Sequence, residues 1–201
     1  MKPLFLAGHP ALDFLNTAFA LPPERTPIEL IGDGEALVAW LLAAELLDKA
    51  SAAKLKRRSS HQALNEAAAE ARKFRQWAGE LIARWRSDPN DDYEPELRRL
   101  NGLLERASCY HELVAAKPGW KLVEHNRVDT ASELLALVAA RVAALIALEA
   151  PDLVKRCAGA GCVLWFVDRT KAHRRVFCSA SACGNRAKVA AFRDRQRREG
   201  A

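Results

Sequence analysis

The sequence lacks an uninterrupted apolar run of the length that a membrane span requires. Its longest apolar stretch, residues 131–150, is interrupted by Glu133, Arg141 and Glu149, whereas a span needs roughly 18 to 20 apolar residues. The N-terminal apolar patch meets Gly, His, Pro and Asp too soon for a signal peptide. We therefore expect a cytoplasmic protein with no membrane partner.

Motifs of the common enzyme classes are missing as well. The chain has no Ser/His/Asp arrangement, no Gly-rich loop that would hold a phosphate, and no His or carboxylate set with metal-ligand spacing. It also shows no internal repeat and no long linker. We expect no enzymatic activity.

Positive charge is confined to one end of the chain. Residues 155–201 carry twelve Lys or Arg and three acids, whereas the remaining chain carries 19 basic and 22 acidic residues. Such asymmetry indicates a basic module attached to a near-neutral body. The alternative is a solvated basic tail, but the cysteines inside this segment argue against it.

The body reads as mostly helical. Ala and Leu dominate a chain of 201 residues that is 50% hydrophobic, which favours a folded helical core. The predicted helices cover residues 33–48 with Asp33 as N-cap, 60–85, 95–108, and 130–149, the last apolar over most of its circumference and therefore buried in a bundle. A β-hairpin is predicted around Lys117-Pro118-Gly119. We place a domain boundary near residue 150.

Four of the five cysteines follow Pro151 as two C-x4-C pairs separated by fifteen residues: Cys157, Cys162, Cys178 and Cys183. Two close pairs can place four thiolates around one ion, and zinc accepts tetrahedral sulfur ligands. Four thiolates leave no open position, so one structural Zn²⁺ is expected. Disulfide or iron–sulfur ligation and unliganded cysteines are the alternatives. The fifth, Cys109, is expected to be a small buried hydrophobe.

Between the pairs lie two β-like runs, VLWFV and RRVF, joined by the polar turn DRTKAH. The second pair leads directly into GNRAKVAAFRDRQRR, which has helical periodicity. The order of pair, hairpin, second pair and helix predicts a treble-clef-like zinc finger in residues 151–201. The fold class is therefore mostly α, or α+β, with a helical domain in residues 1–150.

The predicted C-terminal helix carries basic stripes. At 100° per residue, Arg186, Arg193 and Arg197 form one stripe and Lys188 and Arg195 a second, while Val189 and Phe192 lie between them and are expected to pack on the hairpin. Arg174 and Arg175 add charge from the hairpin. These residues suit contacts with nucleic-acid phosphates. Solvated arginines, or arginines paired with the acidic body, are the alternative.

A second cluster of polar residues lies in GHPALDFLNT near the N-terminus. His9, Asp13, Asn16 and Thr17 are close in sequence, and the last three share a face of a helical turn. One interpretation is a pocket for a small effector. The other, which we favour, is that these groups cap helices and satisfy buried backbone.

These motifs resemble a known family. The pattern RC-x4-C-x3-F-x-D-R-T followed by RRVFC-x4-CGNRAK resembles the CGNR zinc finger, and GHPALDFLNT with GDGEALVAWL resembles the ABATE domain that usually precedes it. The resemblance implies a stress-induced transcription regulator with the four cysteines as zinc ligands and with Arg186 and Lys188 as nucleic-acid contacts. Phe177 departs from the Trp that the family often has there.

We therefore expect a two-part regulator. A helical domain would sense a small-molecule effector or form a homodimer, and a zinc module would place a basic helix on DNA. An RNA-binding protein, a module that binds an acidic protein partner, and a zinc–thiolate redox switch are the alternatives.

Overall fold

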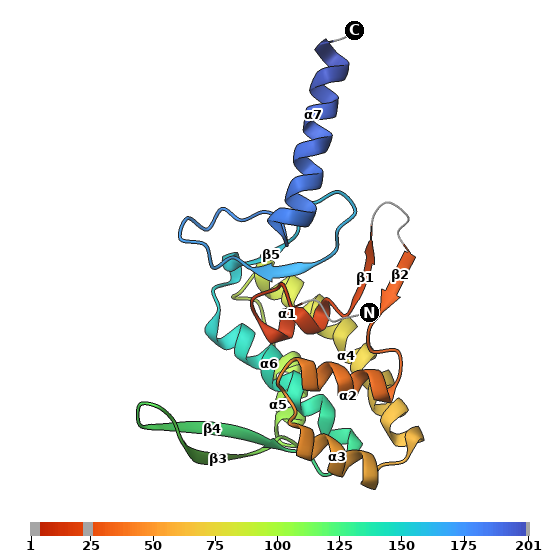
Figure 1. The fold of residues 1–201 in the computed structure, drawn as a ribbon, viewed down its shortest axis with the longest axis vertical. Helices are drawn as coiled ribbons and strands as arrows, with labels where there is room; N and C mark the ends of the chain where they lie inside the picture. The colour runs from red at the N-terminus through yellow and green to blue at the C-terminus, as the bar shows by residue number, and fades with distance from the viewer. Residues whose placement is uncertain (1–4, 22–25, 200–201) are drawn as a thin grey trace.

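The computed structural model describes residues 5–21 and 26–199 and is mostly helical, with three short antiparallel strand pairs (Figure 1). The α-helices are α1 (Pro10–Leu15), α2 (Gly34–Ala43), α3 (Lys49–Arg58), α4 (His61–Ser87), α5 (Glu94–Leu104), α6 (Leu134–Leu148) and α7 (Asn185–Glu199). The strands are β1 (Ala18–Leu21) with β2 (Thr26–Glu29), β3 (Ser108–Ala115) with β4 (Trp120–Arg127), and β5 (Val154–Arg156) with β6 (Trp165–Val167). Short 3₁₀ turns η1 (Ala131–Glu133) and η2 (Pro151–Leu153) flank α6, and a π turn η3 (Ala180–Gly184) leads into α7.

The predicted helices of the body are confirmed, with changes at their ends. Asp33 caps α2, because its Oδ1 accepts from the Ala36 amide at 2.8 Å, and Ser60 caps α4 in the same way. The helix starting at Asp33 is shorter than predicted: α2 ends at Ala43, and Glu45 adopts a left-handed backbone with φ of 57°. The chain therefore turns there, and a separate helix, α3, follows.

Helix α6 lies at the centre of the bundle, as its apolar circumference predicted. Leu134, Val138 and Val142 are buried, and the helix packs against α1, α4 and α5. One expectation is corrected: the window Ala131–Leu148 has a mean hydropathy of 2.0 and, by length and composition, is apolar enough to cross a membrane, although it contains Glu133 and Arg141. With 44% of that window buried inside the protein, α6 serves here as a core helix.

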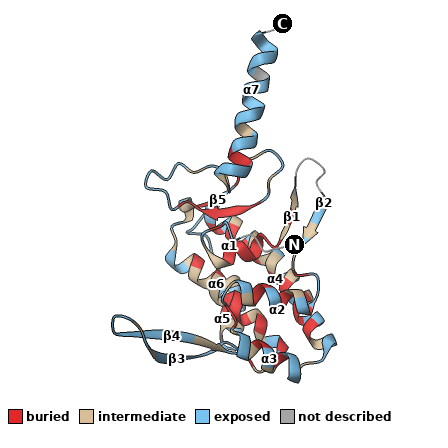
Figure 2. Cartoon of the chain, in the orientation of Figure 1, coloured by how far each residue is buried: buried red, intermediate tan, exposed pale blue. Residues whose placement is uncertain are grey.

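The predicted hairpin around Gly119 is confirmed as the β3–β4 ribbon, which projects from the helical body (Figure 1). Gly119 has φ of +87°, a conformation that glycine adopts without strain. Most of the ribbon is exposed (Figure 2), including Trp120 at 73%. The expectation that Cys109 is buried is therefore wrong, since this residue lies on the exposed ribbon.

The strand pairing of the C-terminal segment differs from the prediction. VLWFV supplies β6, but its partner is β5, which precedes Cys157, and RRVF forms no strand. The reason is Asp168, whose Oδ2 accepts the Arg175 amide at 2.8 Å and folds residues 168–175 into a loop. The C-terminal segment is still a hairpin followed by a helix. The first cysteine pair, however, lies between the two paired strands and not before them.

The two halves of the chain share one core. Val154, Trp165 and Val167 of the C-terminal segment are buried in the same apolar cluster as α1, α4 and α6. A smaller cluster joins Phe19 of β1 to Phe166 and the cysteines. The C-terminal hairpin is therefore fixed against the helical body, whereas α7 extends away from the body (Figure 1).

Candidate metal centre and basic helix

The four predicted ligands meet in one place. The Sγ atoms of Cys157, Cys162, Cys178 and Cys183 all lie within 4.8 Å of one another. Cys157 follows β5, Cys162 precedes β6, and the second pair brackets the start of η3. Gly161, with φ of +71°, reverses the chain between the first two cysteines. Residues as far apart as 26 positions, Cys157 and Cys183, are thus gathered at one point by a short hairpin and a turn.

The geometry fits a tetrahedral metal ion. Bonds of about 2.3 Å from zinc to sulfur imply sulfur–sulfur edges of about 3.8 Å in a tetrahedron. The Sγ of Cys178 lies 3.8 Å from that of Cys162 and 3.6 Å from that of Cys183. All four cysteines are free thiols and none forms a disulfide. The donor set is the one that zinc prefers in structural sites, so these residues could hold a metal ion.

Hydrogen-bond donors contact two of the sulfurs and favour their thiolate forms. The amides of Cys178 and Gly159 donate to the Sγ of Cys157 at 3.2 Å and 3.4 Å, and Arg186 donates to the Sγ of Cys183 at 2.9 Å. Donors of this kind stabilise thiolates and orient metal ligands. The Arg of the CGNR motif therefore contacts the metal site itself.

Burial acts against ionisation of the same thiols. It raises the pKa of Cys162 to about 11 and also raises the pKa of Cys178, with the neighbouring sulfurs adding to the effect. At Cys157, burial likewise opposes ionisation, but the two amide donors and the thiols of Cys178 and Cys162 together outweigh it and hold the pKa below its usual value. Four thiolates this close need a cation to compensate them, and metal binding would release their protons.

Gly159 makes the approach of the two cysteine pairs possible. A Cβ at this position would lie 3.0 Å from the Sγ of Cys183 and 3.4 Å from that of Cys157. A side chain there would press on the sulfur cluster, and the cysteines would have to shift by a few tenths of an ångström to admit it.

Asp168, which is not among the predicted site residues, organises the loop between the cysteine pairs. Its buried carboxylate accepts from Lys155 Nζ at 2.7 Å, from Thr170 Oγ1 at 2.6 Å and from the Arg175 amide. Burial alone would raise its pKa, but these donors together hold the pKa well below its usual range. In the sequence, Asp168 could have been recognised as an acid that ends the apolar run VLWFV and directly precedes a basic turn.

The predicted nucleic-acid residues fall into two groups. Arg175 is used inside the protein: its guanidinium donates to the carbonyls of Phe177, Cys178 and Leu6 and lies 4.3 Å from the centre of the Phe166 ring. Arg186 contacts Cys183, as described above. The other predicted residues are exposed: Arg174, Lys188, Arg193, Arg195 and Arg197.

The predicted C-terminal helix is confirmed as α7, but its predicted packing on the hairpin is not. Val189 and Phe192 are 40% and 55% exposed, so they do not pack on the hairpin as expected. The helix leaves the body at η3 and stands free in solvent (Figure 2). Both basic stripes of α7 are therefore open to solvent. Val189 and Phe192, which lie between the stripes, are exposed as well.

The four polar residues of the N-terminal motif bond to the protein itself. His9 Nδ1 caps α1 by accepting from the Ala11 amide at 3.2 Å, Asp13 accepts from the Ala7 amide at 3.0 Å, and Thr17 donates to the Phe14 carbonyl. Asn16 spans the two halves of the chain: it donates to the Trp165 carbonyl at 2.9 Å and accepts the Trp165 amide at 2.8 Å. These bonds match the capping and backbone role that we favoured.

The effector interpretation of the same residues gains no support from the cavities described in the protein, none of which is lined by His9, Asp13, Asn16 or Thr17. Burial raises the pKa of Asp13, and the amides of Ala7 and Leu6 act in the opposite direction. A carboxyl group held in this way serves the local fold.

Comparison with known protein families finds a match for each half of the chain. A family model described as "CGNR zinc finger" matches residues 154–196, and one described as "Putative stress-induced transcription regulator", the ABATE domain, matches residues 8–149. A search among curated proteins found no match. The matched ranges meet between α6 and β5, and the sulfur cluster lies inside the zinc-finger range. The chain therefore belongs to the ABATE family and carries a CGNR zinc finger at its C-terminal end.

Proposed function

We propose that the protein is a transcription regulator that binds DNA through α7 and that one structural Zn²⁺ holds this helix on the body. The observation that carries the proposal is the free-standing basic helix directly attached to the sulfur cluster. No enzymatic activity is part of the proposal. A cytoplasmic location, a homodimer and the absence of a membrane partner stay predictions.

Charge and exposure of α7 support the DNA contact. Among the described residues, no carboxylate forms an ion pair with Lys188, Arg193, Arg195 or Arg197. Cations without internal partners are available to phosphates, and each neutralised phosphate releases counterions from the duplex. An α-helix with its side chains has the dimensions of the major groove.

The metal would act on structure and not on chemistry. Bound zinc would supply the positive charge that lets four neighbouring thiols ionise together, and a full set of sulfur ligands leaves no position for a reacting water. Cys178 and Cys183 would fix the first turn of α7, while Cys157 and Cys162 would fix it to the β5–β6 hairpin. Arg186 would offset part of the thiolate charge.

The proposal is tested by fluorescence anisotropy with a labelled random duplex and zinc-loaded protein. We expect the affinity to fall steeply as salt rises from about 50 mM to about 200 mM. The double variant Arg193→Ala/Arg197→Ala should bind more weakly and lose about 2 from the slope of log affinity against log salt, because each contact contributes about 0.9.

A matched double variant, Arg57→Ala/Arg86→Ala, removes two exposed arginines of the body and should leave both affinity and slope unchanged. Equal loss in the two double variants, or no duplex binding at low salt, would refute the role of α7. Tighter binding to single-stranded RNA than to duplex DNA would replace DNA by RNA as the partner, since the same exposed cations serve both.

A further inference from the structure

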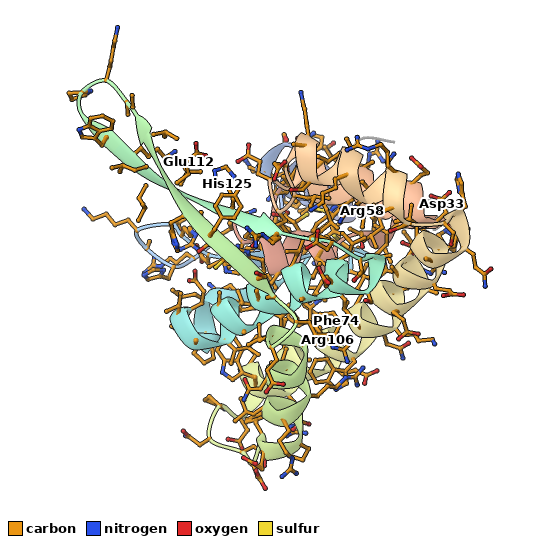
Figure 3. The ribbon with its side chains drawn as sticks, turned by 90° about the horizontal axis from the view of Figure 1, so that it is seen from below. Asp33, Arg58, Phe74, Arg106, Glu112 and His125 are labelled. Carbon is orange, nitrogen blue, oxygen red and sulfur yellow. The ribbon has the colours of Figure 1, made fainter. Side chains whose placement is uncertain are left out.

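A cavity of about 980 Å³ lies in the helical body, away from the cysteines and from the polar residues of the N-terminal motif. It is bounded by the end of α3, by α4 and α5, and by η1 with the start of α6. Figure 3 labels Arg58, Phe74 and Arg106, three of its lining residues from different segments. Cavities of this size commonly bind small molecules.

The floor of the cavity is apolar. Phe74 and Ala67 of α4 are buried beneath it, and Leu103 and Leu135 are half-buried at its sides. An apolar group placed there would leave water and contact carbon on several sides, which is the main source of affinity in such sites.

Cations gather at the rim. Four arginines line the cavity: Arg58, Arg98, Arg99 and Arg106. Arg58 lies 3.4 Å from Asp129, Arg98 lies 3.3 Å from Glu94, and Arg99 lies over the Trp77 ring at 4.3 Å. Neither Arg99 nor Arg106 forms an ion pair with a carboxylate in the part of the chain that the structure describes.

The acids of the rim offset only part of this charge: Asp129 is paired with Lys54 and Arg58 and Glu70 with Lys73, which leaves Glu66, bonded to the neutral Gln62, against Arg99 and Arg106. Three carboxylates line the cavity and each accepts a hydrogen bond from a side chain: Glu66 from Gln62, Glu70 from Lys73 and Asp129 from Lys54. Lys54 and Lys73 hold the pKa of Asp129 and Glu70, respectively, below its usual value. The unmatched charge at the rim is therefore positive.

The N-terminus of α4 adds to the positive rim. Ser59 and Ser60 line the cavity at the start of this 27-residue helix, where first-turn amides and the helix dipole favour an anion. An apolar floor with arginines and a helix start at its edge suits a molecule with an apolar body and a negative head.

We propose that this cavity binds a small organic carboxylate with an alkyl or aryl body, the anion lying near Arg99 and Arg106 and the body over Phe74. The proposal concerns the helical domain alone and does not depend on DNA binding by α7. It places a small-molecule site far from His9, Asp13, Asn16 and Thr17.

The test uses the full zinc-loaded chain and the fluorescent aromatic anion 1-anilinonaphthalene-8-sulfonate as probe. We expect saturable fluorescence that octanoate displaces and octylammonium, of the same chain length and opposite charge, does not. Displacement to the same extent by both competitors would overturn the assignment of an anion.

Two variants locate the probe. Gly102 of α5 lines the cavity, and a Cβ added there meets no atom within 4 Å, so Gly102→Phe fills the space without a backbone clash. It should abolish displaceable binding. Arg106→Gln should weaken binding about fivefold, as expected for one partly exposed charge contact.

Arg86→Gln, an exposed arginine outside the cavity, is the matched control and should bind as the unchanged protein does. Thermal unfolding confirms that all variants are folded. Unchanged binding in Gly102→Phe would place the probe elsewhere and overturn the site. Unchanged binding in Arg106→Gln, with loss in Gly102→Phe, would overturn the anion contact and leave an apolar cavity.

Discussion

Replacing Asn16 by Ala should destabilise both halves of the protein together. Asn16 is 3% exposed, and its amide makes two hydrogen bonds to the backbone of Trp165, which is 149 positions away in the sequence. Both Trp165 groups are buried, and Ala offers neither a donor nor an acceptor. Because the residue ties α1 to β6, the loss falls on the junction of the two halves.

The size of the effect follows from the groups left unpaired. A buried backbone N–H or C=O without a partner costs about 1–3 kcal/mol, so the two together cost about 2–6 kcal/mol. At about 2–4 °C per kcal/mol for a chain of this size, a loss of about 3 kcal/mol lowers the Tm by about 6–12 °C. Asn16→Asp should be comparable, because an oxygen would replace the donor that faces the Trp165 carbonyl.

The assay is urea unfolding of zinc-loaded protein, followed by tryptophan fluorescence and, in parallel, by zinc release to a colorimetric chelator. We expect one transition in both signals, shifted to lower urea in Asn16→Ala. The control is Asn101→Ala, an exposed Asn of α5, which should stay within about 0.5 kcal/mol of the unchanged protein. A change in Asn16→Ala no larger than in this control, or zinc release well separated from loss of the fluorescence signal, would refute the reasoning.

Three further changes test the site and its surroundings. Gly159→Ala should weaken zinc binding at least about tenfold in a chelator competition, because its Cβ would lie 3.0 Å from the Sγ of Cys183; unchanged affinity would show that the cluster can relax. Burial lowers the pKa of His9, so its contribution to stability is present above about pH 6.5 and is lost as the pH falls. The stability advantage of the unchanged protein over His9→Asn, a cap that does not titrate, should therefore shrink between about pH 8 and about pH 5.5; a growing advantage in denaturant titrations would contradict this. Asp168→Asn should increase trypsin cleavage in the loop of residues 168–175 about tenfold, since the Lys155 ion pair is lost, and equal cleavage rates would argue against Asp168 as its anchor.

Local signals in the sequence predicted the elements that local chemistry determines. Asp33 and Ser60 precede their helices and cap them, and the apolar circumference of residues 130–149 marked the core helix α6. The spacing of the cysteines was also sufficient to predict that the four sulfurs meet. Each short pair requires a local turn of the chain, and two such turns can face one ion. In each case the signal lies within a short stretch of sequence, although the contacts of α6 and of the cysteines join residues further apart.

The errors lie where a distant residue decides the local structure. RRVF has the composition of a strand, but Asp168 takes the Arg175 amide and Arg175 itself reaches the Leu6 carbonyl, 169 positions away. Cys109 lies on a ribbon that the body leaves uncovered, and Val189 and Phe192 have no partner surface because the hairpin faces the body. The cavity near Phe74 combines four segments, so no single stretch of sequence carries its signal.

The exposure of α7 bears on the thermodynamics of any binding event. A helix of 15 residues is marginal on its own in water, and beyond Ala187 the described side chains of α7 are exposed, so little packing supports it. Arg193 and Arg197 stand four residues apart, a like-charge spacing that opposes the helix. Phosphates would remove this repulsion and allow the helix to order. Part of the binding free energy would then be used for this ordering. Binding should therefore have a more favourable enthalpy and a less favourable entropy than binding by a preformed helix. The outer turns of α7 are thus a place where affinity could be gained by helix-stabilising substitutions that touch no nucleic acid.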